Sequence, residues 1–446
     1  MSQHQGKSAT GSNRRTFIKQ AAAVTAVAGA GNIIKTPVYG QSKAPSTGRV
    51  IGANDRVNVG FVGVGNQGFN THVRQIKNNT GKHNARPVAA CDVFSEYRDR
   101  AKEFMGIGSG DVYDDHRRLL ERKDIDAVII ATGDHWHAPV AIDSMNAGKH
   151  VLIEKPMTRY LSEAFDVYDT CKRTKRVMQI GAVFCIEKKW HQAAQLVRDG
   201  MIGPLVLGQS SYCRNSPKGE WNYTINPKLT DKSIDWSRWL GQTGKRPFNA
   251  DHFFRWRKYH PYCCGILGDL LAQKIHPLMI ASGNPEFPNR VACLGTKEIT
   301  TDRDVPDNTQ VLANFPSGYT LMVVGSTVNQ QGLPEMLRGH HGTLYFGNDK
   351  VDLKPETPFG DEIAPESFSG LKPSGADFFA EHADWFKVMR NGGETQGNID
   401  LSMRAQVVIS LAEMSERMSL TLLFDKKSRK ITTGTGQEVQ PLNYPA

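Results

Sequence analysis

A short glycine-rich turn constrains this sequence more than any other feature. The apolar run VNVGFV reads as a buried strand, and GVGNQG follows it with the spacing G-x-G-x-x-G. In such a turn the first glycine permits a tight bend, the second lets the backbone approach a pyrophosphate, and the third allows the next helix to pack closely. The turn therefore predicts a dinucleotide site that includes Gly63, Gly65, Asn66, Gln67 and Gly68.

An acidic residue ends the next predicted strand. Asp92 closes the apolar part of RPVAACDVF, 24 residues after Gly68. A carboxylate at this place bonds the ribose hydroxyls of NAD and repels the extra phosphate of NADP, so NAD is the favoured cofactor. Strands and helices then alternate, which predicts an α/β fold: a doubly wound parallel (Rossmann) sheet over residues 55–180.

Two further motifs in this half carry a family resemblance. TGDHWH runs from Thr132 to His137, and Glu154, Lys155 and Pro156 end a later strand. With the glycine turn, these motifs resemble the Gfo/Idh/MocA family, named for glucose-fructose oxidoreductase, inositol dehydrogenase and rhizopine catabolism. The resemblance covers residue 55 to the C-terminus. It implies cofactor contacts from Thr132, His135, Trp136, His137, Glu154 and Lys155, with Asp134 beside the nicotinamide.

Lys155 is the residue on which the predicted chemistry depends. A residue at the carboxyl end of a strand faces the crevice where open α/β sheets bind ligands. An ammonium there can bond a sugar hydroxyl and stabilise the alkoxide that forms as hydride leaves. Lys155 is therefore expected to be catalytic and to contact the substrate.

The chain changes character after residue 180. Segments such as TQVLANFPSGYTLMVVGSTV are rich in β-formers. The resemblance implies that residues 181–446 form an α+β domain with an open, mainly antiparallel sheet, which binds substrate and also serves in homo-oligomers. Residues 373–420 return to a helical pattern and are expected to pack back on the Rossmann domain.

The resemblance also implies a helix with Asp and, four residues later, His facing the substrate. Here GDLLAQKIHP supplies Asp269, but Gln273 stands where the histidine is expected. His276 lies seven residues after Asp269, on the same face of an ideal helix. Either His276 replaces the usual proton acceptor, or the chemistry has changed, since glutamine cannot accept a proton near neutral pH. Asp269, Gln273 and His276 are all predicted to contact substrate, and His276 or Asp269 is predicted to be catalytic by handling the proton.

An aromatic and basic insert separates the two halves. Aromatic faces stack on sugar rings, while charged groups bond sugar hydroxyls. Within FFRWRKYHPYCC, the candidate substrate ligands are Arg257, Lys258 and Tyr259. Seven cysteines are present, with no C-x-x-C pair, so neither a zinc site nor a disulfide framework is predicted. Whether Cys263 and Cys264 pair is left open.

The N-terminus predicts export. Two arginines in NRRTFIK precede a weakly apolar stretch rich in alanine and glycine, which fits a twin-arginine signal and linker over residues 1–45. The formal charge of +10 is partly due to this segment. No apolar run elsewhere approaches the roughly 20 residues of a membrane helix. We expect the twin-arginine machinery as partner, a periplasmic location, and neither nucleic-acid nor membrane binding by the mature protein.

Export sharpens the functional prediction because the periplasm offers no NAD pool. The leading hypothesis is an NAD-dependent oxidoreductase that keeps its cofactor bound and moves hydride at a ring carbon of a sugar. A redox-neutral alternative is an NAD-dependent glycosidase or lyase, in which transient oxidation permits elimination of the glycosidic bond. A third is a sugar-binding relative without catalysis, for which Gln273 is the main argument.

Overall fold

The computed structural model describes residues 51–52, 55–372 and 375–444. Contacts divide the chain into Met1–Ala44 and Pro45–Ala446, so every described residue lies in the second unit. The predicted signal segment, residues 1–45, lies outside the described residues. Among the helices of the described part, none combines the length and apolarity that crossing a membrane requires.

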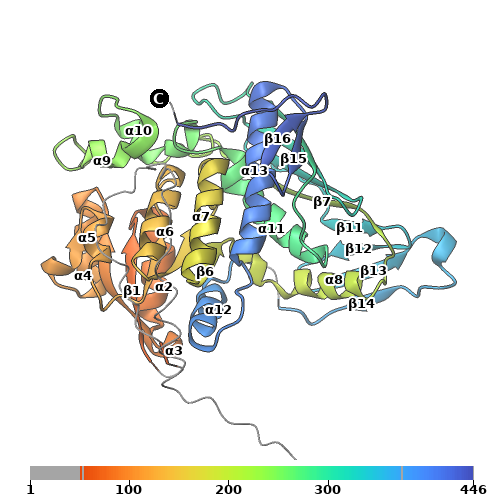
Figure 1. The fold of residues 1–446 in the computed structure, drawn as a ribbon, viewed down its shortest axis with the longest axis horizontal. Coiled ribbons are helices and arrows are strands. Elements are labelled where there is room, and N and C mark those ends of the chain that lie inside the picture. Colours follow the sequence, from red (N-terminus) through yellow and green to blue (C-terminus); the bar gives the residue numbers. More distant parts are fainter. Residues whose placement is uncertain (1–50, 53–54, 373–374, 445–446) are drawn as a thin grey trace, which may run out of the picture. The chain divides into compact units, whose positions relative to one another are not determined.

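The glycine turn belongs to a parallel sheet of six strands, which confirms the predicted Rossmann-type arrangement (Figure 1). In spatial order its strands are β3 (Val112–Tyr113), β2 (Ala85–Cys91), β1 (Val57–Val62), β4 (Ala127–Ile130), β5 (His150–Glu154) and β6 (Met178–Gly181). The order reverses between β1 and β4. A crevice at such a reversal, outside the carboxyl ends of the strands, is where open α/β sheets bind their ligands.

Helices cover both faces of this sheet, and its strands are accordingly apolar on both sides. Every residue of β4 is buried, for example. The chain enters the first helix through a π-helical turn, Gly68–Val73. The helices are α2 (Arg74–Asn78), α3 (Thr80–His83), α4 (Ser95–Met105), α5 (His116–Leu120), α6 (His137–Asn146) and α7 (Leu161–Thr174).

The second half forms a ten-stranded sheet that is antiparallel except where β7 pairs with β10. It confirms the predicted open, mainly antiparallel sheet. In spatial order the strands are β14 (Glu366–Phe368), β13 (Val351–Pro355), β12 (Gly342–Phe346), β11 (Met336–Gly339), β7 (Leu205–Cys213), β10 (Thr320–Ser326), β9 (Asn308–Asn314), β8 (Arg290–Thr296), β15 (Leu422–Asp425) and β16 (Lys430–Thr433).

Two C-terminal helices reach back to the first sheet. α13 (Ile399–Met418) contacts β8 of the second sheet and also α7, and it is buried around most of its circumference (Figure 1). α12 (Phe378–Asn391) contacts α2 and α3. The remaining helices are α8 (Lys188–Arg198), α9 (Trp236–Leu240), α10 (Ala250–Phe254) and α11 (Ala272–Ala281).

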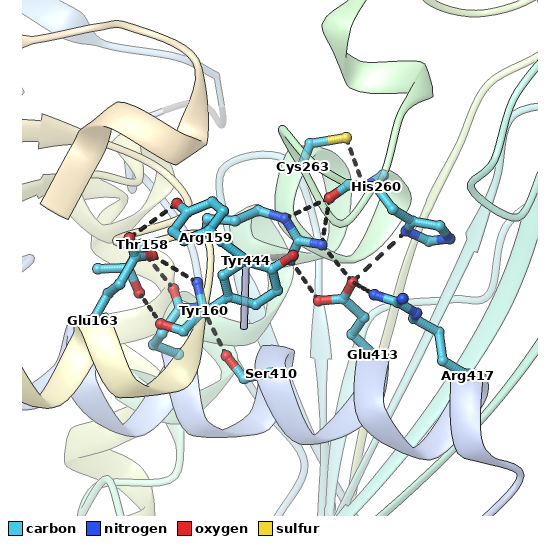
Figure 2. Close-up of polar contacts among 12 residues, drawn as sticks. Thr158, Arg159, Tyr160, Glu163, His260, Cys263, Ser410, Glu413, Arg417 and Tyr444 are labelled. Carbon is cyan, nitrogen blue, oxygen red and sulfur yellow. Dashed lines mark hydrogen bonds and ion pairs between the residues drawn. The ribbon is translucent and has the colours of Figure 1, made fainter. Parts of the chain in front are cut away.

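A buried ion pair ties α13 to the loop after β5 (Figure 2). The two guanidinium ends of Arg159 each lie 2.7 Å from an oxygen of Glu413, and both side chains are almost fully buried. Arg159 also donates to the backbone carbonyl of His260, at 2.6 and 2.9 Å. Burial raises the pKa of Glu413, but the Arg159 guanidinium outweighs this and lowers it overall. The loop that carries Lys155 is thereby fixed to two distant segments.

Candidate active site

A cavity of about 350 Å³ lies at the carboxyl ends of the parallel strands. It receives side chains from both halves of the chain. The predicted site residues in its wall are Gly63, Gly65, Asn66, Gln67, Asp92, Thr132, Trp136, His137, Glu154, Lys155, Arg257 and Asp269. These predicted residues therefore meet at one cavity. The predicted Gly68 lies just behind the wall, in the turn itself.

The glycine turn has no room for side chains. A Cβ added to Gly68 would lie 2.0 Å from the carbonyl oxygen of Gly63, far inside contact distance. Gly63 has φ +83°, and its added Cβ would lie 2.6 Å from the backbone of Ala131. This close packing is the role the fingerprint assigns to its outer glycines, and it leaves backbone N–H groups free to face a pyrophosphate.

Asp92 is held in place by the backbone at the end of β2. Its two carboxylate oxygens accept from the N–H groups of Val64, at 2.9 Å, and Phe94, at 3.0 Å. Burial raises its pKa. The carboxylate still lines the cavity, where a ribose would lie. The residues present thus fit a dinucleotide, and a bound nicotinamide would supply a two-electron hydride acceptor.

Glu154 is the centre of a buried polar chain. Its Oε1 accepts from Gln67 Nε2 at 2.6 Å and from His72 Nε2 at 3.0 Å. On the other side of the imidazole, His72 Nδ1 lies 2.9 Å from His382 Nε2 of α12. Burial raises the pKa of Glu154, but the His72 contacts and the Lys155 charge outweigh it and lower the pKa to about 2. Glu154 is therefore an ionised acceptor at neutral pH.

Lys155 and Asp269 form the polar end of the cavity. Lys155 Nζ donates to the side-chain Oδ1 and to the backbone oxygen of Asp269, both at 2.7 Å, and the peptide bond to Pro156 is cis. Arg257 Nε donates to the same Oδ1 at 3.1 Å, and Trp221 Nε1 donates to Oδ2 at 2.8 Å. Burial opposes ionisation of Asp269, but the two cations hold its pKa far below the usual range. This carboxylate cannot take up a proton near neutral pH.

The loop after β4 is the third wall. Thr132, Trp136 and His137 face the cavity, whereas His135 does not line it. His135 is buried, and its Nε2 bonds the carbonyl oxygen of Trp239 at 2.8 Å. His137 Nδ1 donates to the carbonyl oxygen of Pro156 at 2.7 Å. Burial lowers the pKa of His137 to about 4, so it is a neutral imidazole.

His276 does not line the cavity, and the prediction that it contacts the substrate as a proton acceptor is wrong. It is 1% exposed, its Nδ1 donates to the carbonyl oxygen of Ala272, and burial lowers its pKa to about 4. A separation of seven residues along a helix is a rise of about 10 Å. A π-helical turn, Leu267–Leu271, also precedes α11 and changes the rotation that the prediction assumed. Gln273 likewise lies outside the cavity wall.

Of three consecutive substrate candidates, only Arg257 faces the cavity. Lys258 is 3% exposed, and its Nζ lies 2.9 Å from Asp302. Tyr259 bonds Asp251 through its hydroxyl group. Trp256, Arg257 and Lys258 form a short 3₁₀ helix, in which successive side chains point about 120° apart. The prediction that Lys258 and Tyr259 contact the substrate is corrected accordingly.

The insert, residues 221–262, forms a segment that we call the cover segment. It contacts the loop after β2, where Ser95 N–H donates to Ser233 O at 3.1 Å and Asp235 N–H to Val93 O at 3.3 Å. It also contacts the loop after β4, where Trp239 O accepts from the indole of Trp136 at 2.8 Å. α9 and α10 of this segment lie above α5 and α6 in the view of Figure 1. The cover segment thus bonds to the segments that follow β2 and β4, both of which contribute residues to the cavity wall.

Several wall residues were not predicted. Tyr97, Asp114, His116, Arg214, Tyr223, Arg238, Phe253, Phe254 and Trp256 line the cavity. The aromatic richness of the insert signalled some of them, but nothing local marks the others. In the described part of the chain, no group of three or more His, Cys, Asp or Glu side chains is placed to hold a metal ion. Cys263 and Cys264 are both buried free thiols.

Comparisons with known proteins agree with an NAD-binding Rossmann fold in the first half of the chain. Residues 57–182 match the model of the oxidoreductase family GFO_IDH_MocA, NAD-binding Rossmann fold. An alpha-N-acetylgalactosaminidase of Shewanella oneidensis is 35% identical over 214 residues, which are 45% of this chain and 46% of that protein. A glycosyl hydrolase family 109 protein of Shewanella baltica is 34% identical over 215 residues, with the same coverage. The matched region thus spans about half the length of these relatives.

Solved structures share the fold over most of the chain. A levoglucosan dehydrogenase in complex with NADH and levoglucosan superposes with a TM-score of 0.61 and 19% identity, covering 84% of this chain and 99% of that one. An aldose-aldose oxidoreductase from Caulobacter crescentus has the same TM-score and identity, with 83% and 100% coverage. Residues 57–182 of this chain are therefore similar to the NAD-binding Rossmann domain of Gfo/Idh/MocA oxidoreductases.

Proposed function

We propose that this protein is an exported NAD-dependent oxidoreductase that acts on a sugar or sugar derivative and keeps its cofactor bound. The observation that carries the proposal is the Lys155 ammonium, which is held by Asp269 in the wall of the nucleotide cavity. A hydroxyl oxygen placed against this ammonium would be stabilised as it gains negative charge. Arg257 lies at the same end and would orient further hydroxyls.

The cavity wall also supports a sugar as substrate. Tyr223 and Trp256 of the cover segment line the same cavity. Their rings offer faces on which a sugar ring can stack. Lys155 and Arg257 supply donors for hydroxyl groups. With nicotinamide bound, hydride would pass between a ring carbon and the cofactor while Lys155 stabilises the oxygen.

The cover segment supports retention of the cofactor. It bonds to the loops after β2 and β4, and its Trp239 and Phe253 are buried in an aromatic cluster with Phe94 of the first domain. Release of a nucleotide would require these contacts to break. Retention in turn fits export by the twin-arginine route, which carries folded proteins, to a compartment without free NAD.

A redox-neutral glycosidase is the second candidate, and the names of the relatives favour it. In that reaction, oxidation of a ring hydroxyl acidifies the neighbouring C–H. Loss of that proton expels the glycosidic oxygen, water adds to the double bond, and hydride returns to the carbonyl. No net NADH forms, so an enzyme with a trapped cofactor needs no external acceptor.

The test begins with protein purified without added nucleotide. We expect roughly stoichiometric NAD or NADH when it is denatured and the released compounds are identified by mass spectrometry. Native protein is then incubated with free sugars and an electron acceptor and, in a separate assay, with p-nitrophenyl α-N-acetylgalactosaminide. Acceptor-dependent oxidation indicates the dehydrogenase, whereas nitrophenol release without NADH accumulation indicates the glycosidase. Bound NAD with neither reaction would favour a sugar-binding protein, and an empty site would refute cofactor retention.

A further inference from the structure

Most carboxyl groups of the cavity are already engaged. The five in its wall are Asp92, Asp114, Asp134, Glu154 and Asp269. Asp92 accepts from two backbone N–H groups, and Asp114 pairs with Arg238 at 3.5 Å. Glu154 and Asp269 have the partners given above. Of these five, only the Asp134 carboxyl has neither a hydrogen bond nor an ion pair among the residues that the structure describes.

Asp134 lies where a reacting group is needed. It is 3% exposed and begins the 3₁₀ turn Asp134–Trp136, just past the carboxyl end of β4. β4 pairs directly with β5, whose end carries Lys155. The two side chains thus line one cavity from loops that follow adjacent strands. Burial raises the pKa of Asp134 to about 8, against the opposing charges of Arg257 and Lys155.

The other proton acceptors considered for this site are unsuitable. The Asp269 carboxylate is bonded through both oxygens, and His276 lies in the core. A carboxyl whose pKa lies near the working pH can both take up and release a proton during one cycle. Asp134 has that property and has unengaged oxygens, and it lies in the cavity wall.

We propose that Asp134 exchanges the proton of the substrate hydroxyl that is oxidised. In the oxidative step the Asp134 carboxylate takes the hydroxyl proton and becomes a carboxylic acid. The C–H bond breaks as hydride passes to the nicotinamide, and the O–H electrons form the C=O bond, stabilised by Lys155. The return of hydride reverses both transfers. This inference rests on the proposed function and names the residue that carries its proton.

The test is Asp134→Asn, with Asp361→Asn, at an exposed aspartate outside the cavity wall, as the matched control. Asparagine keeps the shape and a hydrogen-bond acceptor, so the bound nucleotide should remain. The rate at which substrate reduces bound NAD should fall about 10²-fold or more, the usual scale for a lost acid–base group. In the wild type this rate should rise with pH as the Asp134 carboxyl ionises, and in Asp134→Asn that rise should disappear. The charged groups that set this titration are Arg257, Lys155, Asp269 and Arg159.

A second measurement, the pH dependence of the melting temperature, detects the ionisation of the Asp134 carboxyl without requiring catalysis. A carboxyl whose pKa is raised by folding costs stability as pH rises above its unfolded value of about 3.9, up to about pH 8. The melting temperature of Asp134→Asn minus that of the wild type should therefore increase across this range and then level off. The difference for Asp361→Asn, at an exposed position, should not follow this course.

The outcomes separate two kinds of failure. If the wild type reduces no bound NAD with any sugar or glycoside, the proposed function fails, and the role of Asp134 fails with it. If the wild type reacts and Asp134→Asn reacts equally well, only the role of Asp134 is refuted. Loss of nucleotide from Asp134→Asn, with normal rates once NAD is restored, would instead make Asp134 a cofactor ligand and overturn the proposal.

Discussion

Replacement of Lys155 by methionine should abolish turnover and leave the nucleotide in place. The ammonium is the donor that stabilises negative charge on the reacting oxygen, and loss of one such donor costs roughly 10²–10³-fold in rate. Methionine removes the charge as well, so we expect a loss of at least about 10³-fold. The Lys155 ammonium donates to Asp269, whereas the nucleotide would be held by the glycine turn and Asp92.

Folding should survive this change because Asp269 keeps other partners. Arg257 and Trp221 still donate to its carboxylate when the ammonium is gone. Mass spectrometry of the released nucleotide and the rate of substrate-driven NAD reduction are the two measurements. Lys426→Met, at an exposed lysine beyond β15, is the control for a generic loss of charge. Retention of more than a tenth of the wild-type rate in Lys155→Met would contradict the role given to this lysine.

Glu413→Gln should cause the largest loss of stability. The substitution leaves the Arg159 guanidinium buried without a counter-charge, and breaking a buried pair in this way costs about 3–5 kcal/mol. For a folded unit of this size, that lowers the melting temperature by roughly 5 °C. Thermal unfolding followed by circular dichroism measures the change. Arg417→Gln is the control, because Arg417 contacts the same carboxylate at 3.2 Å from a partly exposed position.

A double replacement makes the electrostatic explanation testable. Arg159→Met combined with Glu413→Leu removes both charges, and an apolar pair of similar volume is often no less stable than the ion pair it replaces. The double variant should therefore melt above Glu413→Gln. If it melts lower, packing around Arg159, rather than an uncompensated charge, accounts for the loss in the single variant.

Sequence reasoning succeeded where chemistry depends on residues close together in the chain. The glycine turn, Asp92 and Lys155 each follow a strand directly, so their places at one edge of the sheet follow from the strand pattern. It failed for His276 because the prediction assumed an ideal helix, and the π-helical turn before α11 left no trace in residue spacing.

Contacts between distant segments were not predictable. His72 bonds Glu154 across 82 positions, and Trp221 reaches Asp269 across 48. Asp134 was placed beside the nicotinamide by resemblance alone. Its unengaged carboxyl depends on which cavity residues have already found partners, and that is a property of the whole fold rather than of any motif.

The contacts from Glu154 through His72 to His382 show that the first domain depends on a helix near the C-terminus. The family-matched region ends at residue 182, yet the imidazole that bonds Glu154 has its other contact on α12, about 200 residues later. Arg159 likewise finds its counter-charge on α13. The nucleotide-binding unit recognisable in the sequence is therefore smaller than the unit that folds. Transplanting residues 57–182 into another protein would leave the buried Arg159 without its counter-charge and His72 with only one of its two contacts.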